Sequence, residues 1–123
     1  MGQKILVVDD EAADRKKLVT ALEKEGYSVT EVSSPLDAIG KAMEIHPDLV
    51  ITDVLMPETT GFDLCRHIKA ALHPSPPLVL LVTGKAQGVN VTLAHHMGAD
   101  GFEAKTGDMS LVIRATRSLL LHI

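Results

Sequence analysis

The sequence is nearly free of aromatic residues, with two Phe, one Tyr and no Trp among 123 residues. Proteins that bind single-stranded nucleic acid stack the bases on aromatic side chains, and this chain offers no such platform. The net charge is -4, which gives no basic surface for duplex DNA. We therefore expect no direct contact between this domain and nucleic acid.

Cysteine is also scarce, because Cys65 stands alone and cannot form an internal disulfide. No apolar run approaches the roughly 20 residues that a membrane-spanning helix needs. The chain opens directly into a strand pattern rather than a signal peptide. Met1-Gly2 resembles the start of a myristoylation signal, but Leu6 replaces the required Ser or Thr. These absences predict a cytoplasmic protein that does not contact the membrane.

Short apolar runs alternate with longer amphipathic stretches, a pattern typical of a parallel α/β sheet. The predicted strands span 3–9, 28–32, 48–53, 78–83 and 100–104, and the predicted helices span 12–25, 35–45, 62–72, 88–97 and 108–122. Right-handed crossovers then give one domain over residues 1–123. We predict a flavodoxin-like (βα)5 fold, a five-stranded parallel sheet in the order 2-1-3-4-5 with helices on both faces. Strand 28–32 is short and polar, so we place it at an edge.

Periodicity and capping signals predict how the helices pack. Pro35 starts the second helix, and Asp108 caps the last one. The residues predicted to face the core are Leu18, Val19, Leu22, Ile39, Met43, Ile45, Leu64, Cys65, Ile68, Leu72, Val112, Thr116, Leu119 and Ile123. Leu121 falls opposite the buried stripe of the last helix. It is either an exposed chain-end residue or part of a surface that binds a partner or a second copy in a homodimer.

Acidic, hydroxyl and basic side chains stand where the predicted strands end. Asp9 and Asp10 follow the first strand, Asp53 closes the third, Thr83 closes the fourth, and Lys105 follows the fifth. Ligands bind at the carboxyl ends of strands in an open parallel sheet. These side chains should therefore converge at one site although they are far apart in the sequence.

Three carboxylates in one site repel one another, by on the order of 4 kcal/mol per pair at ~4 Å and an effective dielectric near 20. The site therefore needs a cation or a carboxyl group with a raised pKa, and a set of oxygen ligands suits Mg²⁺. We predict Asp10 and Asp53 as direct ligands, Asp9 as a ligand through water, and the backbone carbonyl of Leu55 as a further ligand. A metal, a lysine and a hydroxyl together make a phosphoryl-transfer site. In that site Asp53 is the nucleophile, and Lys105 and Thr83 contact the phosphoryl oxygens.

The same residues carry a resemblance to a known family. The motifs are Val7-Val8-Asp9-Asp10-Glu11, Asp53-Val54-Leu55-Met56-Pro57 followed by Gly61, Val82-Thr83-Gly84, and a segment from Ala94 to Lys105. In this order and spacing, the chain resembles the receiver domain of two-component response regulators over essentially its whole length.

The resemblance implies that Asp53 accepts a phosphoryl group, with Mg²⁺, from a phosphohistidine of a sensor histidine kinase or phosphotransfer protein. It also implies that Thr83 and Phe102 report phosphorylation to the face formed by helix 88–97, strand 100–104 and helix 108–122. That face would then control a downstream protein or an output domain.

One departure from the family pattern leaves an alternative open. The family usually has Pro after the lysine, with a cis peptide, but Lys105 is followed by Thr106. A cis bond without Pro costs ~2.5–4 kcal/mol, so the bond is either cis or trans with Gly107 absorbing the turn. A misplaced Lys105 would favour an interaction module that takes no phosphate.

A further alternative is a Mg²⁺-dependent phosphohydrolase, which would need an acid where Leu55 stands. We therefore expect no enzyme acting on a separate substrate. Apolar Leu55 also predicts slow self-dephosphorylation, because it cannot orient a water.

Overall fold

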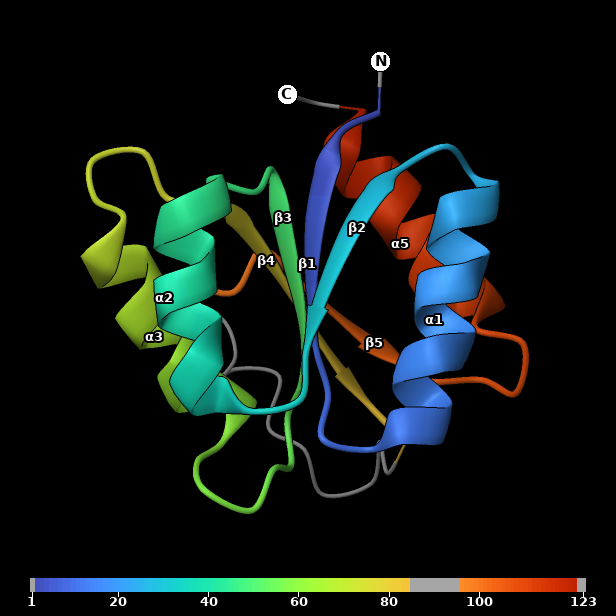
Figure 1. Ribbon diagram of the computed structural model, residues 1–123, viewed down its shortest axis with the longest axis horizontal. Helices are drawn as coiled ribbons and strands as arrows, with labels where there is room; N and C mark the ends of the chain where they lie inside the picture. Colours follow the sequence, from blue (N-terminus) through green and yellow to red (C-terminus); the bar gives the residue numbers. More distant parts are fainter. Residues whose placement is uncertain (1, 85–95, 122–123) are drawn as a thin grey trace.

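The computed structural model describes residues 2–84 and 96–121. Its strands are β1 (Lys4–Val8), β2 (Ser28–Val32), β3 (Leu49–Asp53), β4 (Leu78–Thr83) and β5 (Gly101–Ala104). They form one parallel sheet in the order β2-β1-β3-β4-β5 (Figure 1). The predicted strand number, direction and order are all confirmed. The predicted helix 88–97 falls largely outside the described residues.

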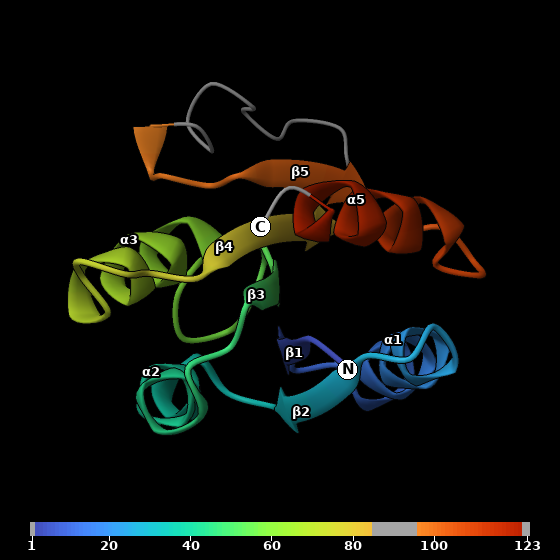
Figure 2. The same ribbon diagram turned by 90° about the horizontal axis from the view of Figure 1, so that it is seen from above.

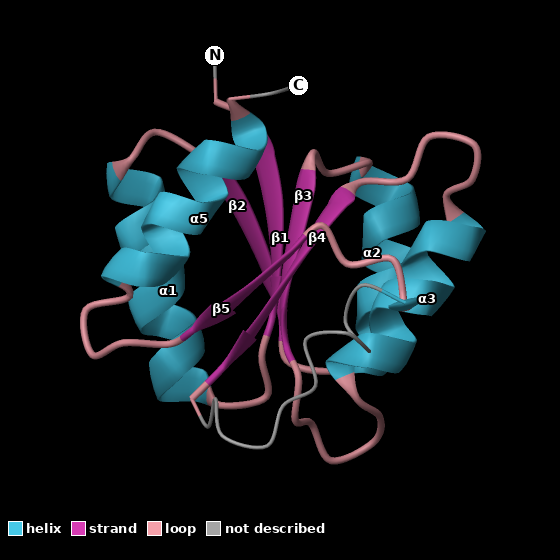
Figure 3. Cartoon of the chain, turned by 180° about the vertical axis from the view of Figure 1, so that it is seen from behind, coloured by secondary structure: helices cyan, strands magenta, loops and turns pink. Residues whose placement is uncertain are grey.

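The described helices are α1 (Ala12–Lys24), α2 (Pro35–Ile45), α3 (Gly61–Ala71) and α5 (Ser110–Leu120). Seen from above, α1 and α5 cover one face of the sheet, and α2 and α3 cover the other (Figure 2). The view from behind shows the strands sandwiched between these two pairs (Figure 3). Within the described part of the chain no helix combines the length and apolar character that a bilayer crossing requires.

The core is divided between the two faces of the sheet because successive strand residues point in opposite directions. In β1, Ile5 and Val7 join the cluster beneath α1 and α5, whereas Leu6 and Val8 join the cluster beneath α2 and α3. All four are fully or almost fully buried. β2 is only half-buried, as predicted for an edge strand. The continuous apolar runs therefore reflect strands covered on both sides.

Local chemistry explains the helix boundaries. α1 stops before Gly26, which has φ +92°, a left-handed conformation that glycine adopts without strain. α2 starts at Pro35, and the Ser34 hydroxyl caps it by accepting a hydrogen bond from the backbone N–H of Leu36 at 3.1 Å. α2 ends where His46 turns to φ 48°, just before Pro47.

Two helix predictions need correction. Met43 is 53% exposed, and Ala38 and Ala42 take the buried face of α2 instead, because small side chains let the helix lie close to the sheet. The last helix begins at Ser110 and ends at Leu120, which is shorter than 108–122. Asp108 still caps it by accepting the Ser110 backbone N–H at 3.0 Å.

The remaining core predictions have mixed outcomes. Cys65 is buried, as predicted, and Leu121 is 79% exposed, as expected for its side of α5. Leu119 is only half-buried because Leu120 takes the position against the sheet. Ile123 lies outside the described residues. A homodimer surface at Leu121 stays a prediction.

Candidate functional site

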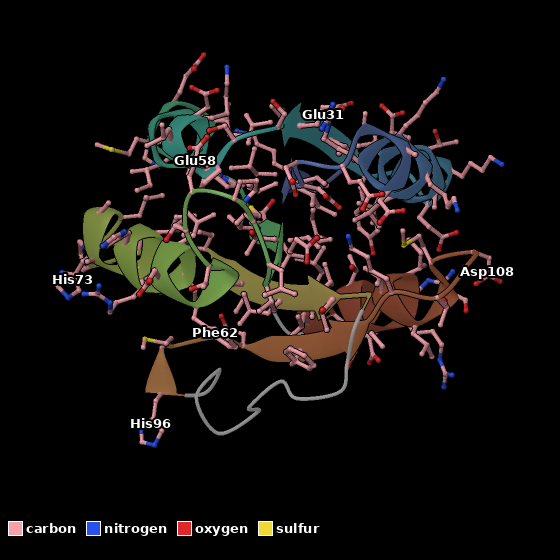
Figure 4. All side chains as sticks on the ribbon, turned by 90° about the horizontal axis from the view of Figure 1, so that it is seen from below. Glu31, Glu58, Phe62, His73, His96 and Asp108 are labelled. Carbon is pink, nitrogen blue, oxygen red and sulfur yellow. The ribbon has the colours of Figure 1, made fainter. Side chains whose placement is uncertain are left out.

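The carboxyl ends of the strands form one edge of the molecule, which faces the viewer in Figure 4, near the labelled Glu31 at the end of β2. The sheet register aligns the site residues along this edge. Asp53 ends β3 and pairs with Val82, next to Thr83 at the end of β4. The backbone N–H of Lys105 donates to the carbonyl of Thr83 at 2.9 Å. Parallel pairing therefore brings together residues from distant parts of the sequence.

The three predicted carboxylates do converge. One oxygen from each of Asp9, Asp10 and Asp53 lies within 4.8 Å of the others. Asp9 and Asp53 are buried, whereas Asp10 is exposed. Backbone N–H groups orient the buried pair, since Glu11 donates to Asp9 at 2.9 Å and Leu55 donates to Asp53 at 3.4 Å. A compact set of carboxylate oxygens with one open side has the donor chemistry that Mg²⁺ prefers.

The Lys105 ammonium lies among these acids, and the Lys105 side chain is only 6% exposed. Its Nζ donates to Asp9 at 2.8 Å, to Asp53 at 3.0 Å and to Asp14 at 3.2 Å. The cis peptide found in the described residues precedes Pro74, so the bond after Lys105 is trans. The lysine reaches the acidic site without the family's usual proline.

Asp14 was not predicted from the sequence. It lies in the first turn of α1, four residues after Asp10. The short loop after β1 carries Asp10 and leads directly into α1, so Asp14 lies beside the same site. An acid in a first helical turn is common, because it complements the helix dipole. Because a first-turn acid has this ordinary explanation, there was little reason in the sequence to expect a contact between Asp14 and Lys105. The only sequence feature that indicated Asp14 was its i, i+4 spacing from Asp10.

Burial and ion pairing act together on the charges of the site. Burial raises the pKa of Asp9 above its ordinary value, although the hydrogen bond from Lys105 opposes this. Burial alone would lower the pKa of Lys105, but hydrogen bonds and charge from Asp9 and Asp53 outweigh it and raise that pKa. The lysine is therefore firmly charged and compensates part of the acidic cluster.

A cavity of about 250 Å³ opens at this edge. Its lining includes Asp10, Glu11, Asp14, Asp53, Leu55, Thr83, Gly84 and Lys105. Thr83 is almost fully buried in its wall, and Leu55 stands at the rim with 57% of its surface exposed. The predicted nucleophile, lysine and hydroxyl thus share one solvent-accessible space.

Gly61 supports the loop that follows Asp53. Its backbone N–H donates to the carbonyl of Val54 at 2.8 Å. A Cβ at this position would overlap the carbonyl oxygen of Asp53 and lie 3.0 Å from Val54 Cα. Only glycine permits this close approach, which explains its place eight residues after Asp53.

The predicted signalling residues are only partly described. Phe102 is half-buried in β5, aligned with Leu81 and packed against the cluster beneath α2 and α3. Most of the predicted helix 88–97 lies outside the described residues, so the face that Phe102 was predicted to switch is described at β5 and α5. The switching role of Phe102 and Thr83 stays a prediction.

Comparison with known proteins agrees with this geometry. The family model described as response regulator receiver domain matches residues 5–117. The transcriptional regulatory protein ResD of Bacillus subtilis is 36% identical over 120 residues, which cover 98% of this chain and 46% of that protein. The DNA-binding response regulator MtrA of Mycobacterium tuberculosis is 36% identical over 105 residues, which cover 85% of this chain and 45% of that protein.

A solved structure shows the same fold. The response regulator protein TrrA from Thermotoga maritima, in complex with Mg²⁺-BeF, has a TM-score of 0.84 and 26% identity. The match covers 95% of this chain and 98% of that one.

The chain spans about half the length of the curated relatives it matches. The DNA binding named for MtrA belongs to a protein of which this chain matches less than half. The expectation of no nucleic-acid contact therefore does not extend to full-length relatives. Because the family model covers residues 5–117 and ResD is 36% identical over 98% of the chain, the chain belongs to the receiver domain family of two-component response regulators.

Proposed function

We propose that this domain accepts a phosphoryl group on Asp53 from a phosphohistidine of a sensor histidine kinase or phosphotransfer protein. The observation that carries the proposal is the placement of Asp53, with its carboxylate 3.0 Å from Lys105 Nζ and beside two further acids at an open cavity. Phosphorylation would then control a downstream protein or an attached output domain.

In the transfer step, an oxygen of Asp53 attacks the phosphorus and the P–N bond of the donor breaks. The donor imidazole leaves with the bonding electron pair and takes up a proton. The Lys105 ammonium and the Thr83 hydroxyl would donate hydrogen bonds to the phosphoryl oxygens. Positioning and charge compensation supply most of the catalysis in such transfers.

Mg²⁺ fits the oxygen donors at this edge of the sheet. Asp10 and Asp53 would bind it directly, Asp9 through a water molecule, and Leu55 through its backbone carbonyl. The ion supplies positive charge that offsets the carboxylates and the phosphoryl oxygens. Lys105 already compensates part of the negative charge of Asp9 and Asp53. Mg²⁺ and a phosphoryl group would add one further positive and one further negative group to the same site.

The response to phosphorylation would start at Thr83. A phosphoryl group brings ~1.5–2 negative charges and strong hydrogen-bond acceptors. Its pull on the Thr83 hydroxyl would free space into which the Phe102 ring can rotate. A shift from 1:99 to 99:1 needs about 5.5 kcal/mol of differential interaction. The receiving surface would include β5 and α5, where a partner or a second copy of the chain would dock.

We assign no separate substrate to this domain, which would catalyse only its own phosphorylation and dephosphorylation. We also propose a cytoplasmic location, since the phosphohistidine donors of such systems are exposed there. Any contact with DNA would belong to an output region such as that of MtrA, outside residues 1–123.

Intact-mass spectrometry after treatment with acetyl phosphate and Mg²⁺ tests the proposal. Wild-type protein should gain the mass of one phosphoryl group, and Asp53→Asn should gain none. Asp63→Asn is a matched control, because Asp63 is a half-exposed acid on α3 that pairs with Arg66 and does not line the cavity. An unmodified wild type would favour an interaction module. Steady release of phosphate from free phosphoesters would favour a phosphohydrolase.

A further inference from the structure

Lys105 has one acidic partner that is not shared with the candidate cation site. Among the described residues, the group of acids that fits a metal consists of Asp9, Asp10 and Asp53. Lys105 contacts two of these and also Asp14, at 3.2 Å. Asp14 belongs to a different element, the first turn of α1, and its side chain is 30% exposed.

A divalent cation and the Lys105 ammonium would compete for the same carboxylates. Lys105 contacts Asp9 and Asp53, and the cation would use Asp53 directly and Asp9 through water. Two cations held a few ångströms apart repel each other. Binding of the metal therefore pushes the ammonium away from those two acids. A lysine driven into water would be lost to the phosphoryl group that it is expected to contact.

The backbone of Lys105 is fixed because its N–H donates to the Thr83 carbonyl at 2.9 Å, but four methylene groups separate the ammonium from that bond. Thr106 follows it in a trans peptide, so no proline ring restrains the backbone there. The position of Nζ depends instead on its side-chain contacts. α1, by contrast, is held to the sheet by Leu18 and Leu22, both buried, so Asp14 projects from a fixed support.

We infer that Asp14 is a positioning residue for Lys105: it anchors the ammonium at the edge of the site when a divalent cation binds among Asp9, Asp10 and Asp53. This inference rests on the proposed function, because it assumes the cation. In this arrangement Asp14 would bind neither the cation nor the phosphoryl group itself. It allows the cation and the lysine to occupy the site together.

A double-mutant cycle tests the inference. The Mg²⁺ dissociation constant is measured by titration calorimetry for wild type, Asp14→Asn, Lys105→Met and the double variant, with folding checked by circular dichroism. Asp14→Asn should weaken Mg²⁺ binding about threefold to tenfold when Lys105 is present, and less than about twofold in the Lys105→Met background, since the effect passes through a contacting pair. Asp14→Glu should restore most of the affinity.

A spectroscopic measurement separates positioning from simple charge. In the complex with Mg²⁺ and beryllofluoride, the NMR signal of the Lys105 side chain should stay shifted in wild type and move to a solvent-like value in Asp14→Asn. Glu11→Gln is the control, because it also removes one negative charge from the cavity lining. Among the described residues, the Glu11 side chain makes no hydrogen bond to Lys105. The effect of Glu11→Gln on Mg²⁺ affinity therefore measures the effect of charge alone.

Three results would overturn the inference while leaving the proposed function intact: equal losses in both backgrounds, no loss in Asp14→Asn, or no rescue by glutamate. A wild type that binds no Mg²⁺ would overturn both.

Discussion

Replacing Lys105 with methionine should destabilise the domain strongly when Mg²⁺ is absent. The side chains involved are largely out of water, with Lys105 6% exposed, Asp9 4% and Asp53 12%. Removing one member of a buried ion pair costs about 3–5 kcal/mol, because the remaining charges stay buried without compensation. The carboxylates of Asp9, Asp10 and Asp53 would then repel one another with no positive charge between them.

Thermal unfolding followed by far-ultraviolet circular dichroism measures this cost. For a domain of this length, 3–5 kcal/mol corresponds to a melting temperature roughly 10–20 °C lower. Saturating Mg²⁺ should restore more stability to Lys105→Met than to wild type, since the ion replaces the missing positive charge. Lys69→Met is the matched control: Lys69 pairs with Asp100 at 2.6 Å outside the site, so its loss should not depend on Mg²⁺.

The stability of the variant should also depend on pH in a defined direction. Burial raises the pKa of Asp9 above 3.8, so the folded state binds its proton more tightly than the unfolded state does. The resulting stabilisation is complete below the unfolded pKa and is lost as the pH rises through the folded pKa. Lys105 opposes this rise in wild type. In Lys105→Met this opposing effect is absent, so the loss of the Asp9 stabilisation should extend to higher pH.

The reasoning would be refuted if Lys105→Met melted at the wild-type temperature in chelator, or if Mg²⁺ stabilised both proteins equally. A variant that gained stability as the pH rose from 4 to 7, with Mg²⁺ absent, would contradict the electrostatic account in particular.

Three further predictions concern the surroundings of the site. The phosphoryl group on Asp53 should be hydrolysed over minutes or longer. Leu55→Asn should accelerate this hydrolysis several-fold, because asparagine can orient a water molecule. Hydrolysis within seconds in wild type would contradict this prediction. Burial raises the pKa of Cys65 to about 11, so a thiol reagent at neutral pH should modify it only after unfolding in urea. In denaturant titrations, Gly61→Ala should lower the free energy of unfolding by about 2–4 kcal/mol, because the new Cβ would overlap the backbone at Asp53. Gly40→Ala in α2 has open space around the new Cβ and should raise the free energy of unfolding by about 0.5–1 kcal/mol.

The fold was predictable from local pattern combined with a topological rule. Apolar runs such as 5–8 and 78–82 are long enough for strands, and both faces of each strand are covered, so their length and continuous apolar character identified them. Errors arose where packing chooses between apolar residues. In α2 the pattern offered Met43, but the close approach of helix to sheet selected Ala38 and Ala42.

The site was predictable to the extent that it is built from strand ends. Asp9, Asp53 and Thr83 take their places from the register of parallel strands, which the order of the elements dictates. The reach of Lys105 was not predictable, because a trans peptide after it was one of two alternatives. Asp14 was missed since its position in a first helical turn has an ordinary explanation.

The amino-acid sequence by itself therefore determined the sheet, its strand order and the gathering of acids at one edge, because these follow from short-range periodicity and right-handed connection. Only the tertiary structure decided which carboxylates the Lys105 ammonium touches. Its contact with Asp14 joins residues 91 positions apart through two side chains, and no local pattern encodes such a distance. That choice results from packing α1 and the loop after β5 against the same sheet.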